Sequence, residues 1–409
     1  MTVVAALDAR TVRAMRTVAQ GIGGRAPSGG AGAEGVAGVA RRMLALQGQD
    51  APGVRWSVGL RAPGTTDADV AAALMDARVV RTWPMRGTLH LVHPADVRWL
   101  LGLTADRMLA SMAARRSALG ITPDDCTRAV DVAHAVLAGR RGLGRSAFLA
   151  ALDAAGVSTA GQRGYHLLAW AAISGHVILG GGPDAQPVVL LADEWLPATP
   201  PRDRDEALTE LAVRYVAGHG PASEADLARW TGLPVTQVRR GIAAAGDALE
   251  TVTVDGRVHH VAAGAVQALT ASEGEMDASG ATGAEAASHG PRHGPAALVH
   301  LLPGFDEYLL GYADRSSALA PEHVDRVIPG ANGMFRATVI ADGRVVGTWT
   351  RSVRAREVGI RVEPFPGARV PDGDQLAAAV AAYGAFAGRP ATVTVEGPPR
   401  RAGARSASR

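Results

Sequence analysis

The sequence has almost no cysteine and no lysine at all. Cys126 is the only thiol among 409 residues, which excludes an intramolecular disulfide and a cysteine-cluster zinc site, so we interpret it as a small buried apolar residue. All 42 basic side chains are arginine, and chemistry through a lysine imine is therefore excluded. No apolar run approaches the roughly 18 residues of a membrane span, and no basic segment with an apolar core opens the chain. We expect a cytoplasmic protein with no membrane partner.

What the chain does contain is apolar and arginine-rich. Hydrophobic residues make up 47% of the sequence, and its length predicts about two to four domains with substantial cores. The net charge of +3 is too small to indicate nucleic-acid binding. Arginine can still recognise phosphates and guanine edges through its bidentate fork, so the distribution of the charges matters more than their sum. The composition is also typical of a GC-rich genome, which explains the missing lysine.

One order of elements occurs three times along the chain: helix, helix, longer helix and strand pair. This order predicts a winged helix-turn-helix module. In the first module, residues 1–94, the wing is expected over residues 79–92, because two apolar-rich strands flank the turn Pro84-Met85-Arg86-Gly87. The helices of this module are expected at residues 8–18, 34–46 and 67–77.

The second and third modules repeat the order. In the second, residues 95–200, the candidate recognition helix spans residues 160–174, and the glycines at 180–182 are expected to form the turn of the wing at residues 177–191. In the third, residues 201–270, the dipeptide Asp255-Gly256 predicts a type I′ hairpin. Further helices are expected at residues 95–119, 123–138, 146–155, 205–217 and 235–245, and Ser223-Glu224-Ala225-Asp226 is expected to cap a short helix.

The remaining sequence changes in character. Residues 271–295 are rich in Ser, Gly, Ala and Glu and are expected to form a solvated linker; we interpret its His289 and His293 as loop residues rather than metal ligands. Residues 296–397 are expected to form a small domain with a hairpin at Asp342-Gly343 and a helix at 374–386, followed by a basic, disordered tail at 398–409. The predicted fold class is α+β: three tandem winged helix-turn-helix modules plus a C-terminal α+β domain with a β-hairpin.

Six segments carry a resemblance to a known family. They are Leu44-Ala45-Leu46-Gln47-Gly48-Gln49, Met85-Arg86-Gly87-Thr88-Leu89-His90-Leu91-Val92, Gly220-Pro221-Ala222-Ser223, Arg229-Trp230-Thr231-Gly232-Leu233, Leu302-Pro303-Gly304-Phe305-Asp306-Glu307-Tyr308-Leu309-Leu310-Gly311-Tyr312 and Asp342-Gly343-Arg344-Val345-Val346-Gly347-Thr348-Trp349. In this order, over nearly the whole chain, the sequence resembles the AlkZ-type winged-helix DNA glycosylases. The resemblance implies a concave DNA-binding surface and removal of bulky or crosslinking alkyl adducts, often as self-resistance in makers of DNA-alkylating antibiotics. A second branch of the family carries an aspartate where Gln49 stands, so the chain resembles the self-resistance branch; the middle position, usually apolar, is Gly48.

The chemistry of such a reaction suits the paired amides Gln47 and Gln49. Alkylation at purine N7 or N3 leaves a positive charge on the base, so the glycosidic bond breaks toward an oxocarbenium ion without strong protonation of the leaving group. The enzyme must place a water near C1′ and stabilise the sugar cation, and amide oxygens can do both. The segment Asp50-Ala51-Pro52-Gly53 indicates a helix end, where residues two apart can converge. Without the family resemblance, capping or solvation would be the simpler interpretation.

Other polar residues are candidates for a role in catalysis or DNA binding. Asp50 could activate the water, although a helix-end or turn residue is the preferred interpretation. Arg86 at the wing tip and His90 on the next strand could contact DNA, or be a solvated turn residue and a satisfied strand histidine. On the expected recognition helices and at the last hairpin, arginines and one histidine are candidates for phosphate contacts: Arg163, His166, Arg239, Arg240 and Arg344.

The acidic and aromatic cluster Asp306-Glu307-Tyr308 suggests a metal or general-base site at first sight. Its apolar neighbours favour a buried carboxylate paired with an arginine such as Arg315 or Arg351 instead. No metal and no cofactor are therefore expected.

Two functions of different classes remain. The first is a monofunctional glycosylase acting on alkylated purines in double-stranded DNA, as a monomer associated with the nucleoid. The second is a non-catalytic winged-helix DNA-binding protein such as a regulator. Three modules in one chain favour the enzyme, because a regulator usually dimerises with one winged helix per protomer.

Overall fold

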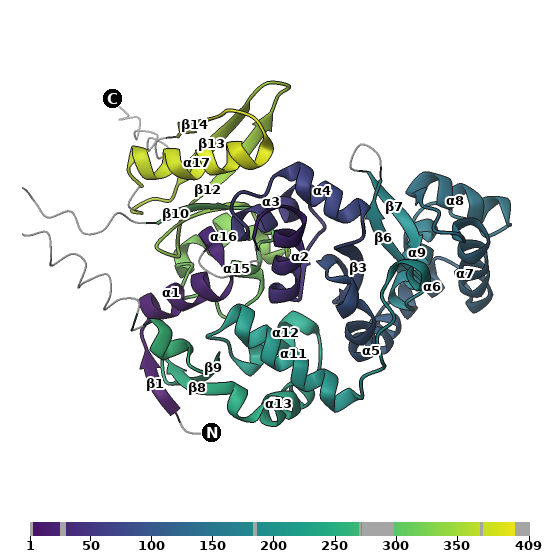
Figure 1. The fold of residues 1–409 in the computed structure, drawn as a ribbon, viewed down its shortest axis with the longest axis horizontal. Helices are drawn as coiled ribbons and strands as arrows, with labels where there is room; N and C mark the ends of the chain where they lie inside the picture. Colours follow the sequence, from purple (N-terminus) through teal and green to yellow (C-terminus); the bar gives the residue numbers. More distant parts are fainter. Residues whose placement is uncertain are drawn as a thin grey trace, which may run out of the picture.

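The computed structural model describes residues 3–24, 30–182, 186–269, 271, 298–368 and 371–396. The expected linker beyond residue 271, including His289 and His293, lies outside the described residues, as does the tail at 398–409. Figure 1 shows the arrangement of the elements, with the C-terminal strands and helix α17 along one side and the N-terminal strand at the opposite side.

The first part of the chain forms two helices and the hairpin where they were predicted, but differs around Gln47. Its elements are β1 (Val3–Leu7), α1 (Ala9–Ala19), η1 (Ile22–Gly24), α2 (Gly32–Met43), β2 (Ala45–Gln47), α3 (Ala51–Arg61), α4 (Asp67–Met75), β3 (Val80–Met85) and β4 (Thr88–Val92). The helix predicted to reach residue 46 is wrong at its end, because Leu44 adopts a φ of 61° and the chain continues as strand β2. Helix α3 was not predicted. Pro52 lies in its first turn, where the missing N–H costs no helical hydrogen bond.

The hairpins of the first two parts join in one sheet. The second part contains α5 (Pro94–Ser111), α6 (Ala113–Ala118), α7 (Pro123–Leu137), β5 (Leu143–Gly144), α8 (Arg145–Ala154), α9 (Arg163–Ile173), β6 (Val177–Gly181), β7 (Pro187–Leu191) and α10 (Ala192–Trp195). The sheet has the order β2-β4-β3-β6-β7-β5, and Arg81 of β3 pairs with Leu179 of β6. Gly180 and Gly181 lie within β6 instead of forming the expected turn. A Cβ on Gly181 would lie 2.8 Å from the Met75 nitrogen, so glycine allows the end of α4 to approach the strand.

The third part follows the prediction closely. It consists of α11 (Arg204–His219), α12 (Glu224–Thr231), α13 (Val235–Ala244), η3 (Gly246–Ala248), β8 (Leu249–Val254) and β9 (Arg257–Ala262). Asp255 and Gly256 have φ values of 47° and 72°, as a type I′ turn requires. The pairing of β1 with β8, parallel and almost 250 residues apart in sequence, was not predicted.

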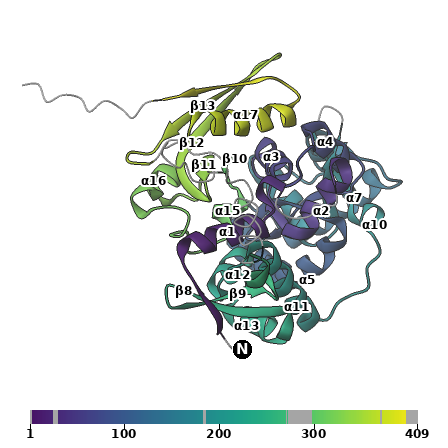
Figure 2. The same cartoon turned by 60° about the vertical axis from the view of Figure 1, so that its left-hand side comes forward.

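The C-terminal part is a five-stranded sheet with one long helix. Its elements are β10 (Val299–Leu302), α15 (Glu307–Leu310), η4 (Pro321–His323), α16 (Val324–Val327), η5 (Pro329–Ala331), β11 (Thr338–Ala341), β12 (Arg344–Val353), β13 (Val358–Pro364), α17 (Gly373–Ala387) and β14 (Ala391–Val395). The strands follow the order β10-β11-β12-β13-β14. Figure 2 shows α17 between this sheet and α3. Trp56 of α3 packs edge-on against Tyr383 of α17, with ring centroids 5.0 Å apart, so the N-terminal and C-terminal parts share one core.

The structure is a mixed α+β fold, as the sequence predicts. The count of three winged-helix modules, and the boundaries between the modules, stay predictions. In the described ranges, no helix is long and apolar enough to cross a membrane.

Candidate active site

Gln47 and Gln49 lie between a strand and a helix. Gln47 ends strand β2 and is the register partner of His90 on β4, and Gln49 precedes helix α3. The pair was expected at the C-terminal end of a helix, and that placement is wrong: pairing with β4 extends the backbone before Gln47, and the pair leads into the N-terminus of the next helix. The strand holds Gln47 with 8% of its surface exposed, whereas Gln49 is exposed.

The two amides contact each other directly. The Gln47 Nε2 group donates a hydrogen bond of 2.9 Å to Gln49 Oε1. Gln47 Oε1 and Gln49 Nε2 take no part in this bond. The side chains of Gln47 and Gln49 therefore converge.

The residue between them is fixed through its backbone. The Gly48 N–H donates to the Leu89 carbonyl at 2.7 Å, and Arg81 Nη2 donates to the Gly48 carbonyl at 3.3 Å. A Cβ added to Gly48 would lie at least 3.5 Å from its nearest neighbours, which is ordinary van der Waals contact. Glycine is therefore not required here by lack of space, and the hydrogen bonds restrain the segment despite its conformational freedom.

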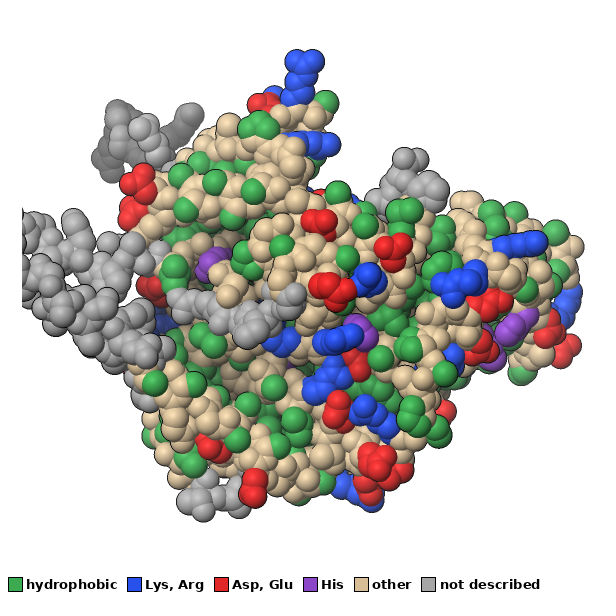
Figure 3. All heavy atoms as spheres, in the orientation of Figure 1, with side chains coloured by type: hydrophobic (Ala, Val, Ile, Leu, Met, Phe, Trp, Pro, Cys, Tyr) green, Lys and Arg blue, Asp and Glu red, His purple; other side chains and the backbone are tan. Residues whose placement is uncertain are grey.

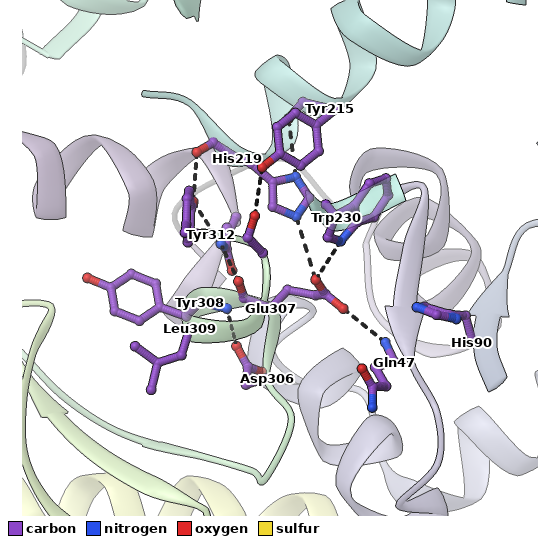
Figure 4. A network of polar contacts seen from close by, with 12 residues as sticks. Gln47, His90, Tyr215, His219, Trp230, Asp306, Glu307, Tyr308, Leu309 and Tyr312 are labelled. Carbon is purple, nitrogen blue, oxygen red and sulfur yellow. Dashed lines mark hydrogen bonds and ion pairs between the residues drawn. The ribbon is translucent and has the colours of Figure 1, made fainter. Parts of the chain in front are cut away.

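Glu307 anchors Gln47 from the C-terminal part of the chain. Its Oε1 accepts the Gln47 backbone N–H at 3.0 Å, and its Oε2 accepts Trp230 Nε1–H at 2.9 Å. The His219 Nε2 atom lies 3.9 Å from Oε2. Figure 4 shows the carboxylate between these three residues. With 1% of its surface exposed, Glu307 is a buried acceptor that joins β2, α11 and α12.

The charges around Glu307 keep it ionised. Burial alone would raise the pKa of the Glu307 carboxyl, but His219, whose Nε2 lies 3.9 Å away, and the Arg86 guanidinium hold that pKa below its usual value. Conversely, burial together with the nearby Arg86 guanidinium lowers the pKa of His90 to about 4. The site therefore contains a buried carboxylate beside a neutral imidazole.

Asp306, next to Glu307, makes a buried ion pair. Arg61 binds its two carboxylate oxygens at 2.8 and 2.9 Å. The predicted structural role of the acidic cluster is thus confirmed for Asp306, but both predicted partners are wrong. Arg315 donates to the Leu309 carbonyl at 2.6 Å, and Arg351 lies 3.9 Å from Asp50. The true partner, Arg61, belongs to helix α3, which the sequence did not reveal.

Of the other candidates, three lie near the glutamine pair. Asp50 occupies the N-cap position of α3, half-buried, in agreement with its interpretation as a helix-end residue. Arg86 lies at the β3–β4 turn with a φ of 55°, and its Nη2 is 3.5 Å from His90 Nε2. His90 is fully buried and donates through Nδ1 to the Thr88 carbonyl at 2.8 Å. Of the two interpretations, a DNA contact or a strand histidine with its hydrogen bonds satisfied, the structure agrees with the second.

The remaining candidates are engaged elsewhere in the fold. Arg163 forms an ion pair of 3.1 Å with Asp125 and donates to the Leu119 carbonyl, and His166 is buried. Arg239 forms an ion pair with Glu224, and Arg240 forms one with Asp205. Arg344 is exposed on strand β12. On the face seen in Figure 3, arginines are interspersed with acidic side chains. DNA binding by these residues stays a prediction.

Sequence reasoning missed three residues of the site. Glu307 stood in a recognised motif but was taken as part of a structural cluster, and nothing local indicates its partner, because Gln47 lies 260 positions away. Trp230 and His219 were not singled out. The only available signal was that the motifs containing Trp230 and Glu307 occur together with the glutamine motif.

The chain matches known proteins over most of its length. A family model described as DNA glycosylase AlkZ-like matches residues 40–386. A curated protein named "Interstrand DNA cross-link repair glycosylase", from Streptomyces sahachiroi, is 28% identical over 347 residues, which cover 80% of this chain and 84% of that protein. Among solved structures, Streptomyces sahachiroi DNA glycosylase AlkZ aligns with a TM-score of 0.73 and 24% identity, over 95% of this chain and 100% of that chain. This last similarity confirms the fold.

Proposed function

The chain belongs to the AlkZ-like DNA glycosylase family, and we propose that it is a monofunctional DNA glycosylase with Gln47 and Gln49 as its catalytic residues. Its substrates are bulky or crosslinking N7- or N3-alkylpurines in duplex DNA. The relative from Streptomyces sahachiroi, named for cross-link repair, supports this substrate class. Gln49, at the position where the other branch has aspartate, supports a role in self-resistance to a genotoxic product.

The observation that carries the proposal is the restrained pair of amides. Gln47 is held by strand pairing and by Glu307, and it bonds to Gln49 at 2.9 Å. Amides fixed in this way can orient a water and stabilise positive charge at the sugar without reorganising during the reaction. Because the leaving base is already cationic, no strong acid is needed.

Glu307 has a positioning role in this mechanism. Both of its oxygens accept N–H groups, and 1% of its surface is exposed, so it does not meet the water that attacks C1′. Asp50 is the alternative base, but it is half-buried, and its Oδ2 atom lies 3.9 Å from Arg351 Nη2. The absence of lysine leaves no side-chain amine to form an imine with the sugar, so the product is an abasic site in an intact strand.

The test is single-turnover release of an N7-alkylguanine from a duplex oligonucleotide, followed by alkali to reveal abasic sites. The double variant Gln47→Ala/Gln49→Ala should lose release and keep DNA affinity. Gln375→Ala, on α17, is the matched control and should behave like wild type. Strand cleavage before alkali would contradict a monofunctional reaction, and DNA binding without release of small or bulky adducts would favour the regulator.

A further inference from the structure

A cavity of about 200 Å³ opens beside Gln49. It lies where strands β3, β4, β6 and β7 meet helix α9, and Figure 1 shows β3, β6, β7 and α9 next to one another. Apolar and aromatic side chains make up most of its lining, with Gln49 and two arginines completing it. The apolar and aromatic residues are Trp83, Leu89, Tyr165, Leu168, Leu179 and Pro187.

The aromatic pair gives the cavity a defined wall. Trp83 is buried and Tyr165 is half-buried, and their rings meet edge to face with centroids 6.2 Å apart. The Trp83 Nε1–H group donates a hydrogen bond of 3.3 Å to the Tyr165 hydroxyl oxygen, so the polar atoms of the two rings bind each other. What these two residues offer a ligand is mainly ring surface.

The charges of the lining distinguish between possible occupants. Arg81 and Arg145 are both cationic, and none of the described residues that line the cavity is a carboxylate. A purine alkylated at N7 or N3 carries a positive charge, so the two guanidinium groups disfavour the entry of the purine ring itself. They do not repel an uncharged substituent, and exposed Arg145 can meet the DNA phosphates beside it.

The volume of the cavity and its position beside the glutamine pair restrict the possible occupants further. Sites for drug-sized ligands occupy roughly 300–1,000 Å³, so this cavity holds one ring system rather than a whole natural product. Arg81 connects it to the glutamine pair, because its Nη2 donates to the Gly48 carbonyl at 3.3 Å. An occupant of the cavity is thus next to the atoms that act on the sugar.

We propose that this cavity binds an uncharged, flat, apolar substituent on the alkylated purine, with an aromatic ring as the preferred group. The inference rests on the proposed glycosylase function and adds where the adduct is recognised. The substituent packs against Trp83 and Tyr165 while the cationic base stays outside, near Gln49. Selectivity for bulky adducts then comes from this cavity and not from the amides.

The test compares single-turnover release of N7-benzylguanine and N7-methylguanine from the same duplex. In Tyr165→Ala the ratio of the benzyl rate to the methyl rate should fall at least tenfold, because a hydrophobic group in a pocket is worth roughly 10–200-fold in discrimination. Tyr165→Phe should keep the ratio. Trp170→Ala is the control, since Trp170 lies on the same helix but stacks on His176 instead of lining the cavity.

A second variant guards against misfolding of Tyr165→Ala. Arg145 is exposed in the first turn of α8, and Arg145→Trp places a bulky side chain at the cavity mouth, so the same ratio should fall. An unchanged ratio in a folded Tyr165→Ala or in Arg145→Trp would overturn the inference while leaving the glycosylase proposal intact. If wild type binds the duplex but releases neither base, the proposed function fails and the inference fails with it.

Discussion

Replacement of Glu307 should damage both the stability of the fold and the rate of base release. In Glu307→Ala the Gln47 N–H and the Trp230 Nε1–H lose their acceptor inside the protein. Each unsatisfied buried donor costs about 1–3 kcal/mol, so two donors predict a loss of roughly 2–6 kcal/mol in the free energy of unfolding. Glu307→Gln keeps one acceptor oxygen and should lose about 1–3 kcal/mol.

The rate effect follows from the position of Gln47. Without Glu307 the end of β2 is free to shift, and a displacement of about 1 Å in a catalytic group can cost on the order of 10²-fold in rate. The assay is single-turnover base release with enzyme in excess, at a temperature where urea titration shows each variant to be folded. DNA affinity should stay near that of wild type, since Glu307 is buried.

A neighbouring residue supplies the control. Tyr308→Phe removes a buried hydrogen bond of 2.6 Å to the Gly343 carbonyl, should cost about 1 kcal/mol, and does not touch Gln47. If Glu307→Ala is folded and releases base as fast as Tyr308→Phe, the positioning role is refuted. If it is also as stable as Tyr308→Phe, the two hydrogen bonds to Glu307 do not contribute as argued.

Two further predictions concern neighbours of the glutamine pair. The pKa of His90 is lowered to about 4 in the folded protein, so the unfolded state binds more protons than the folded state below pH 6.5. His90 should therefore lower the free energy of unfolding by about 2 kcal/mol between pH 7 and pH 5. Urea titrations at pH 7 and pH 5 should show a correspondingly smaller loss of stability in His90→Gln, and a loss equal to that of wild type would contradict the lowered pKa. Gly48→Ala should keep the release rate of wild type, since its Cβ would lie no closer than 3.5 Å to other atoms, and a large loss of rate without loss of stability would show that Gly48 needs its backbone freedom.

The sequence predicts those elements whose signals are local. Asp255-Gly256 and Asp342-Gly343 both form turns with positive φ at the two residues, and helices α11 and α12 of the third part begin at capping boxes such as Ser223 with Asp226. Strand β2 is only three residues long and exists through its pairing with β4. Its residues are compatible with continuing the helix before it, so only the distant partner determines the outcome.

The same reasoning explains why motifs far apart in the chain occur together. The hairpin motif supplies Leu89, which binds the Gly48 N–H, and the motif around residue 230 supplies Trp230, which binds Glu307. The acidic motif supplies Glu307 itself, which binds Gln47. Each motif is weak evidence alone, because tryptophans and carboxylates occur in many cores. Two of them depend on Glu307, since its loss leaves the buried Gln47 and Trp230 N–H groups without their acceptor. The glutamine pair is therefore a property of the whole chain, and a fragment ending before residue 298 would lack the acceptor that holds Gln47.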